Sequence, residues 1–255
     1  MMEKKVIFEA KDLFKQYGSG SGTTVALDHV SLKIYQGELL VILGSSGSGK
    51  STLLNMIGGM DRPTSGGIYI DGNNICNYSD KQMTTYRREK VGFVFQSFNL
   101  IQELTARENV ALTADKSGQS VSIEDAFAIV GLSRKQNRYP SELSGGMQKR
   151  VGIARAIALS PRYLFCDEPN SGLDPKTSLI IDDLIFDITH EFGITTVVNT
   201  HDLNSVITIG ETISYIYEGN LAWTGSMDTV LTSDNQLLNE FIYAQPLTQK
   251  IKQKL

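Results

Sequence analysis

The chain has 255 residues and a formal net charge of −4, with acidic and basic residues interspersed. This length allows one large domain, or a core domain with a smaller insert, and the charge argues against a basic nucleic-acid-binding face. No apolar run approaches the ~20 residues of a membrane span, the first residues do not read as a signal peptide, and Cys76 and Cys166 do not make a disulfide framework, so we expect a cytosolic protein whose membrane role comes through a partner.

The first part of the chain contains two stretches of alternating apolar residues, 6–10 and 30–34, which predict half-buried strands of an antiparallel sheet. A flexible Gly/Ser-rich loop separates them. Continuously apolar runs, typical of strands buried on both faces, follow at 38–44, 91–96, 162–168 and 195–201. Helices are expected after Lys50, Met147 and Pro175, where apolar residues recur at helical spacing. Strand-then-helix repetition predicts a parallel sheet covered by helices.

The stretch 98–141 has no buried-strand pattern, and residues 122–132 within it have a helical pattern. We interpret this stretch as a small helical insert. Residues 213–217 and 221–223 alternate around a short turn and predict a hairpin. The tail, 241–255, is partly apolar and is either a docking segment or a frayed end.

The sequence GSSGSGKS matches the phosphate-loop pattern G-x-x-x-x-G-K-[ST], and it follows an apolar strand and opens a helix. Its glycines let the backbone curl into a nest of N–H groups, and the helix N-terminus adds partial positive charge. Lys50 can reach the terminal phosphates and Ser51 can supply a magnesium ligand. The alternative, a chance glycine-rich turn, does not account for this context. The candidate phosphate-binding residues are Gly44, Ser45, Ser46, Gly47, Ser48, Gly49, Lys50, Ser51 and Thr52.

Two carboxylates, Asp167 and Glu168, end another apolar run. Beside a phosphate loop, Asp167 is placed to hold magnesium through its water shell, and Glu168 to polarise a water against the γ-phosphate. The alternative is that both acids merely cap a strand. His201 ends a further strand, and because parallel strand ends converge on one edge of a sheet, it can approach the same phosphate. We interpret His29 and His190 as structural or solvated.

The phosphate loop, Gln96, LSGGMQ, CDEP, SGLD and His201 occur in an order that closely resembles the ATP-binding-cassette (ABC) ATPases, over nearly the whole chain. The resemblance implies an α/β P-loop NTPase fold with a mixed core sheet, an antiparallel β subdomain and a small helical subdomain. The division that it implies is 1–97 for the β subdomain and first part of the ATP-binding core, 98–160 for the helical subdomain, 161–240 for the second part of the core and 241–255 for a tail.

The resemblance also implies site residues, with ATP and Mg²⁺ as ligands. Tyr17 looks like the aromatic that stacks on adenine, with Val25 beside it. Gln96 looks like a magnesium-linked residue that faces the membrane partner, and Asp174 like part of a loop that couples two sites across a dimer. In this family two cassettes dimerise head to tail, and a second group of residues then closes over ATP bound to the other copy: Ser144, Gly145, Gly146, Met147 and Gln148. Met147 stands where many relatives have glutamine.

The two halves of the sequence are similar to two different types of transporter ATPase. The first half is similar to lipoprotein-releasing (Lol) and macrolide-exporter ATPases. The second half, with SGGMQKR, CDEPNSGLDPKTS and the tail, is similar to the Mla phospholipid-trafficking ATPase, and the change falls between about 109 and 140. We expect a subunit on the cytoplasmic face of the inner membrane, bound to permease subunits and to a second copy or homologous ATPase, with phospholipid or lipidated cargo. A cell-division-type signalling ATPase is the alternative of another class.

Overall fold

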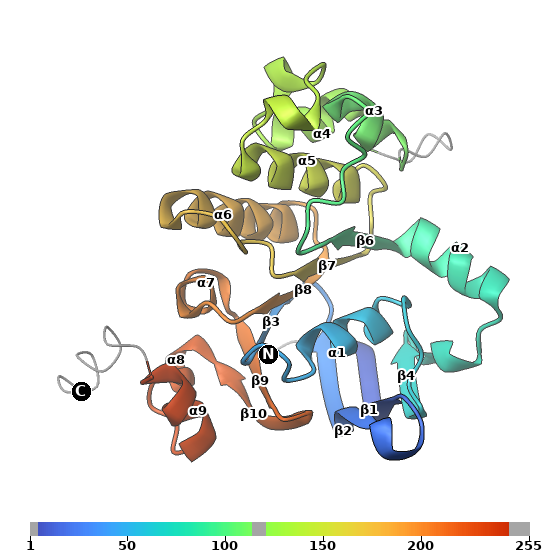
Figure 1. Cartoon of the computed structure of the whole chain (residues 1–255), viewed down its shortest axis with the longest axis vertical. Coiled ribbons are helices and arrows are strands. Elements are labelled where there is room, and N and C mark those ends of the chain that lie inside the picture. The colour runs from blue at the N-terminus through green and yellow to red at the C-terminus, as the bar shows by residue number, and fades with distance from the viewer. Residues whose placement is uncertain (1–4, 114–120, 245–255) are drawn as a thin grey trace. The chain divides into compact units, whose positions relative to one another are not determined.

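The computed structural model describes residues 5–113 and 121–244, which form two compact units. The first unit is built from the described parts of Met1–Asn77 and Asn199–Leu255, and the second from those of Tyr78–Val198. Figure 1 shows both units, labelled by element. Each is described on its own below.

The first unit contains an antiparallel sheet in the order β2-β1-β4-β5. Its strands are β1 (Val6–Tyr17), β2 (Thr24–Tyr35), β4 (Ser65–Ile70) and β5 (Asn73–Asn74). Phe8 lies opposite Ile34 on one side and Ile70 on the other, and all three are buried. The two half-buried strands expected near the start of the chain are therefore confirmed. A short 3₁₀ helix, η1 (Gly20–Gly22), occupies part of the Gly/Ser-rich loop.

The same unit contains β3 (Leu39–Leu43), whose residues are all buried. It pairs in parallel with β9 (Thr212–Tyr217), which forms an antiparallel hairpin with β10 (Asn220–Ser226). Glu218 and Gly219 turn the hairpin at φ 45° and 79°, because a tight turn of this hand needs positive φ. The remaining elements of this unit are α1 (Lys50–Ile57), η2 (Ile75–Asn77), α7 (Leu203–Ile209), α8 (Met227–Val230) and α9 (Gln236–Ile242).

The second unit contains strands in the order β8-β7-β6, where β6 (Val91–Val94) and β7 (Tyr163–Asp167) pair in parallel. Along β8 (Thr195–Thr200) the chain returns to the first unit. The apolar runs predicted as buried strands are buried here, as expected. The helices of this unit are α2 (Asp80–Lys90), α3 (Ala106–Ala111), α4 (Ile123–Ile129), η3 (Ser133–Lys135), η4 (Pro140–Glu142), α5 (Gly145–Ile157) and α6 (Pro175–Glu191).

Some elements were not expected from the sequence, or begin elsewhere than expected. Helix α2 buries only Met83 and Tyr86, so it has almost no apolar stripe. Helix α5 begins at Gly145, before the expected start at Met147, because Ser144 caps it. Helix α9 extends to Ile242, into the first residues of the predicted tail. Residues 245–255 of the tail lie outside the described residues. The predicted four-part division of the chain stays a prediction.

Within the described ranges, no helix has both the length and the apolar character needed to cross a membrane. Cys76 and Cys166 are free thiols.

Candidate functional site

The predicted phosphate loop lies in the first unit, between the end of β3 and the start of α1. Gly49 precedes α1 in the left-handed region, at φ 106°. A Cβ at Gly49 would lie 2.4 Å from the Ala26 carbonyl oxygen, and one at Gly44 would lie 2.4 Å from that of Ile216. Both positions therefore require glycine, because any side chain would push the loop away from strands that hold it.

Two polar groups lie within this loop. Lys50 is only 4% exposed, and its ammonium donates a hydrogen bond to the Ser45 carbonyl across the loop, at 2.8 Å. The Ser48 hydroxyl is buried and has no hydrogen-bond partner among the described residues. A buried hydroxyl without a partner is costly unless a ligand satisfies it. A buried cation, a hydroxyl and a curled backbone at a helix N-terminus fit a polyphosphate.

Tyr17 belongs to a cluster in the same unit. Its hydroxyl donates to Asp61 at 2.7 Å, and the Lys15 ammonium donates to the other Asp61 oxygen at 2.8 Å and lies 4.7 Å from the Tyr17 ring centre. Burial raises the pKa of the Tyr17 hydroxyl, and the Asp61 carboxylate raises it further. Partial burial also raises the pKa of Asp61, but hydrogen bonds from Lys15, Tyr17 and the Arg62 amide outweigh it and hold that pKa below its usual value. The Tyr17 ring is thereby oriented while 44% exposed.

Val25 and His201 also lie in the first unit. Val25 is 49% exposed and pairs with Gln16, next to Tyr17 in β1. His201 follows the last residue of β8 and is exposed. The other two histidines lie beside oxygen acceptors. His29 Nδ1 lies 2.8 Å from Asp12, and His190 Nδ1 lies 2.8 Å from a carbonyl one turn earlier in α6.

The two carboxylates lie in the second unit, where Asp167 is the last residue of β7. Glu168 follows it in the left-handed region at φ 44°, a strained conformation for a residue with a side chain. The Gln96 amide nitrogen lies 3.3 Å from a Glu168 carboxylate oxygen and 3.5 Å from the Ser171 hydroxyl. The structure thus brings together Gln96 and Glu168, which are far apart in the sequence.

The motif LSGGMQ opens α5. Ser144 is the N-cap of this helix, and its hydroxyl accepts a hydrogen bond from the Met147 amide at 3.4 Å. The Gln148 side chain donates to the carbonyls of Pro140 and Leu143. The side chains of this motif therefore support their own loop and helix.

Gly146 has a packing role that the sequence did not reveal. A Cβ at this position would lie 2.3 Å from the Thr177 methyl group on α6. Helices α5 and α6 approach each other closely at this point, and only glycine leaves room.

Asp174 is the N-cap of α6. Its carboxylate accepts hydrogen bonds from the Thr177 amide at 3.1 Å and from the Thr177 hydroxyl at 2.5 Å. These bonds lower the pKa of the Asp174 carboxyl. Within its own chain, Asp174 therefore fixes the start of the helix.

Lys149 is a buried cation that sequence reasoning missed. It is 1% exposed, and its ammonium donates to the carbonyls of Phe95 at 3.0 Å and Gln96 at 2.6 Å. Burial lowers the pKa of Lys149 to about 8, and the nearby carboxylates of Asp167 and Glu168 oppose this shift. The helical period could have revealed it, because Lys149 falls four residues before Ile153 on the buried face of α5.

The expected site residues are thus divided between the two units. The phosphate loop, Tyr17 and His201 belong to the first, and Gln96, Asp167, Glu168 and the LSGGMQ motif to the second. In the described ranges no three His, Cys, Asp or Glu side chains gather as a metal site. The expected magnesium set has a single carboxylate, Asp167, with Ser51 and Gln96. One carboxylate with oxygen ligands suits Mg²⁺, which keeps waters and phosphate oxygens in its coordination shell.

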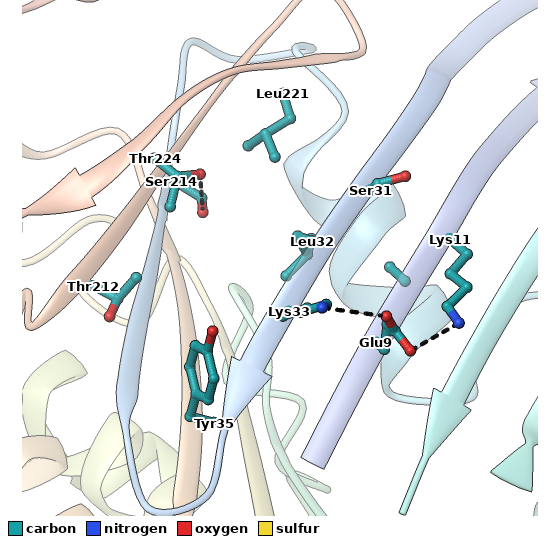
Figure 2. Close-up of a pocket in the computed structure, with 11 residues that line it drawn as sticks. Glu9, Lys11, Ser31, Leu32, Lys33, Tyr35, Thr212, Ser214, Leu221 and Thr224 are labelled. Carbon is teal, nitrogen blue, oxygen red and sulfur yellow. Dashed lines mark hydrogen bonds and ion pairs between the residues drawn. The ribbon is translucent and has the colours of Figure 1, made fainter. Parts of the chain in front are cut away.

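A separate cavity of about 390 Å³ lies among β1, β2, β9 and β10 of the first unit, and no expected site residue lines it. In Figure 2, Glu9 lies between Lys11 and Lys33. Its carboxylate oxygens lie 3.0 Å from the Lys11 ammonium and 3.7 Å from the Lys33 ammonium. Glu9, Lys11 and Lys33 form ion pairs with one another, so these charges are not directed at a ligand in the cavity.

The phosphate loop between a buried parallel strand and a helix defines a P-loop nucleotide-binding protein. Residues 27–171 match the family model described as ABC transporter. The chain belongs to the ABC transporter family, among its ATP-binding and ATP-hydrolysing subunits, and it has the P-loop NTPase fold of that family. The resemblance noted in the sequence is therefore confirmed at this level.

Individual relatives agree. The methionine import ATP-binding protein MetN of Geobacillus kaustophilus is 37% identical over 227 residues, which cover 87% of this chain and 66% of that protein. An uncharacterized ABC transporter ATP-binding protein of Methanocaldococcus jannaschii is 42% identical over 201 residues, covering 77% of this chain and 89% of that one. The chain thus spans about two thirds of the MetN relative.

Among solved structures, the dimeric post-hydrolysis state of the ATP-binding cassette MJ0796 bound to ADP and Pi is similar, with a TM-score of 0.79 and 41% identity. The match covers 87% of this chain and 99% of that one. None of the relatives named here is described as a lipid transporter, so the prediction of a phospholipid or lipoprotein cargo gains no support from them.

Proposed function

We propose that this chain hydrolyses ATP to drive a membrane transporter, with the phosphate loop as the nucleotide-binding element and Glu168, beside Gln96, as the hydrolytic carboxylate. The observation that carries the proposal is the Glu168 carboxylate, which follows Asp167 in a strained backbone conformation and lies 3.3 Å from the Gln96 amide. A carboxylate beside a side-chain amide is a group that can take a proton from a bound water.

The residues take the following roles in this proposal. Lys50 and the loop amides bind the β- and γ-phosphates, and His201 contacts the γ-phosphate. Ser51, Asp167 and Gln96 hold Mg²⁺, which supplies positive charge against the phosphate oxygens when bound. Glu168 takes the proton from the water that attacks the terminal phosphorus. Tyr17 stacks on the adenine, with Val25 at the edge of the base.

The chain acts as one half of a head-to-tail dimer, with itself or with a homologous ATPase. The similar cassette MJ0796 is dimeric, which supports this. Ser144 accepts its capping bond from Met147, so its own proton is still available to donate to a phosphate on the other copy. The amides of Gly145 and Gly146 are at the N-terminus of the same helix, where an anion is favoured. In the same dimer, Asp174 couples the two sites.

The dimer works on the cytoplasmic face of the inner membrane, through permease subunits that provide the membrane contact. For the cargo, the SGGMQKR and CDEPNSGLDPKTS stretches support a phospholipid of the cell envelope, as in Mla-type systems. The names of the MetN relatives support a second candidate, methionine import. Lipoprotein release, macrolide export and cell-division signalling remain alternatives that differ in their membrane partner.

Two experiments test the proposal. Glu168→Gln should abolish steady-state ATP hydrolysis while ATP binding persists, and Glu191→Gln, an exposed glutamate on α6, is the matched control. Undiminished turnover of Glu168→Gln would remove its role as the base. The membrane proteins that co-purify with ATP-trapped Glu168→Gln then identify the transporter, because an Mla-like permease supports lipid and a methionine permease supports import.

A further inference from the structure

Lys149 is a buried cation close to the proposed hydrolytic residues, and only 1% of its surface is exposed. Lysine is almost never fully buried without a partner. In the described part of the chain its ammonium contacts the carbonyls of Phe95 and Gln96 and lies 5.4 Å from the centre of the Phe98 ring. Burying the charge of Lys149 is unfavourable in itself. Its contacts with residues 95–98 must therefore account for its position.

The loop at 95–99 is held along α5 at several points. Lys149 binds its first two carbonyls, and Arg155, further along the same helix, donates to the Asn99 carbonyl at 2.7 Å. The Phe98 ring edge lies 3.5 Å from the Cβ position of Gly145 at the start of α5, and the Phe98 carbonyl oxygen lies 3.9 Å from that of Gly152, between the two cations. Two cations on one helix therefore fix the two ends of the loop.

The position of this loop decides what the Gln96 side chain can reach. The distance from the Gln96 amide to Glu168 is 3.3 Å, near the upper limit for a hydrogen bond, so a small displacement of the backbone removes the contact. Lys149 holds the Gln96 carbonyl at 2.6 Å, so the ammonium restrains this residue from its backbone side.

We propose that Lys149 is a positioning residue for ATP hydrolysis, which fixes the backbone of Gln96 so that its side chain meets Glu168 and thereby links the helix opened by Ser144 to the hydrolytic carboxylate. The inference rests on the proposed roles of Gln96 and Glu168. It extends the function of the LSGGMQ helix, because the same helix that faces a nucleotide at its N-terminus also sets the geometry of the catalytic pair in its own chain.

The test is a double-mutant cycle on ATPase activity with Lys149→Met and Gln96→Ala. Methionine fills the lysine volume but cannot donate to the two carbonyls. Lys149→Met should lower kcat about tenfold and change KM for ATP by less than about twofold, as expected for a residue that acts on the reaction step. Lys149→Arg, which retains a cationic donor, should recover most of the activity. Lys81→Met, at an exposed lysine on α2, is the matched control and should have no effect.

In the Gln96→Ala background, Lys149→Met should have no further effect beyond about twofold, because the side chain that it positions is gone. A merely structural lysine would lower activity equally in both backgrounds, and that result would overturn the inference while leaving the proposed function intact. Full activity of Lys149→Met would also overturn it. If Gln96→Ala alone keeps full kcat, the role proposed for Gln96 is wrong and the inference falls with it.

Thermal unfolding of each variant separates loss of fold from loss of positioning. If Lys149→Met does not fold, Lys149→Leu takes its place in the same cycle. Leucine also cannot donate to the two carbonyls, so the same two outcomes decide.

Discussion

The close approach of α5 and α6 at Gly146 gives a quantitative test of the packing. In Gly146→Ala, the new Cβ would lie 2.3 Å from the Thr177 methyl carbon, while the other Thr177 side-chain atoms near it are at 3.8 and 4.0 Å. The methyl group cannot rotate away freely. Thr177 is β-branched, and its hydroxyl is bonded to Asp174 at 2.5 Å, so rotation about χ1 would break that bond.

The magnitude follows from two opposing effects. Overpacking of this kind costs about 1–3 kcal/mol, whereas alanine in place of glycine within a helix gains roughly 0.5–1 kcal/mol. Gly146→Ala should therefore reduce the free energy of unfolding by about 1–2 kcal/mol. For a chain of this size that corresponds to a fall in Tm of roughly 2–8 °C.

Thr177→Ser is the matched background, because serine lacks the methyl group and keeps the hydroxyl bonded to Asp174. In this background Gly146→Ala should be neutral or stabilising by up to about 1 kcal/mol, since the helix-propensity gain is then unopposed. The four proteins form a cycle, measured by urea unfolding, with a coupling of about 2 kcal/mol between the two positions. An equal loss of stability in both backgrounds would refute the clash as the cause.

Four further outcomes are expected. Gly49→Ala should abolish nucleotide binding, because its Cβ would meet the Ala26 carbonyl at 2.4 Å and φ is 106°; fluorescent-nucleotide titration measures this, and retained affinity would contradict it. Asp174→Asn should destabilise α6 more than Asp183→Asn on the same helix. Because the pKa of Asp174 is lowered in the folded state, its contribution is present above about pH 4 and is lost as pH falls through the folded pKa, so unfolding curves of the two variants should converge there. Tyr17→Ala should weaken ATP binding about tenfold and leave tripolyphosphate binding unchanged, as competition titration would show. Chelation of Mg²⁺ should stop hydrolysis, and added Mg²⁺ should restore it.

The fold was predictable where the sequence has a strong period or a long apolar run. Strand β3 has five consecutive buried residues, and the apolar run predicted it directly. Helix α2 has no such stripe, and its clearest signal is local: Ser79 and Gln82 form a capping box at its start. A polar helix of this kind is stabilised by its cap and by two buried side chains, which hydrophobic periodicity does not detect.

For the candidate site, the sequence predicts motifs, but it does not predict which residues are neighbours in the structure. The phosphate-loop pattern carries its mechanism in its own residues, so Lys50 and Ser51 were assigned from spacing alone. The contacts of Gln96 with Glu168, and of Lys149 with the Gln96 carbonyl, join residues more than fifty positions apart. No local pattern encodes such contacts, because they depend on how β6, β7 and α5 pack.

The same distinction bears on methionine at position 147, where the resemblance to ABC ATPases leads us to expect glutamine. The role of this residue in the structure belongs to its backbone, since its amide donates to Ser144 and caps α5. The neighbouring residues divide the remaining tasks: Gly146 leaves room for Thr177, Gln148 holds the preceding loop, and Lys149 holds the loop of Gln96. A side chain at 147 is therefore free to vary while the helix start stays fixed. In the dimer proposed above, the feature that would recognise an anion is the N-terminus of α5, and the bond from the Met147 amide to Ser144 fixes it.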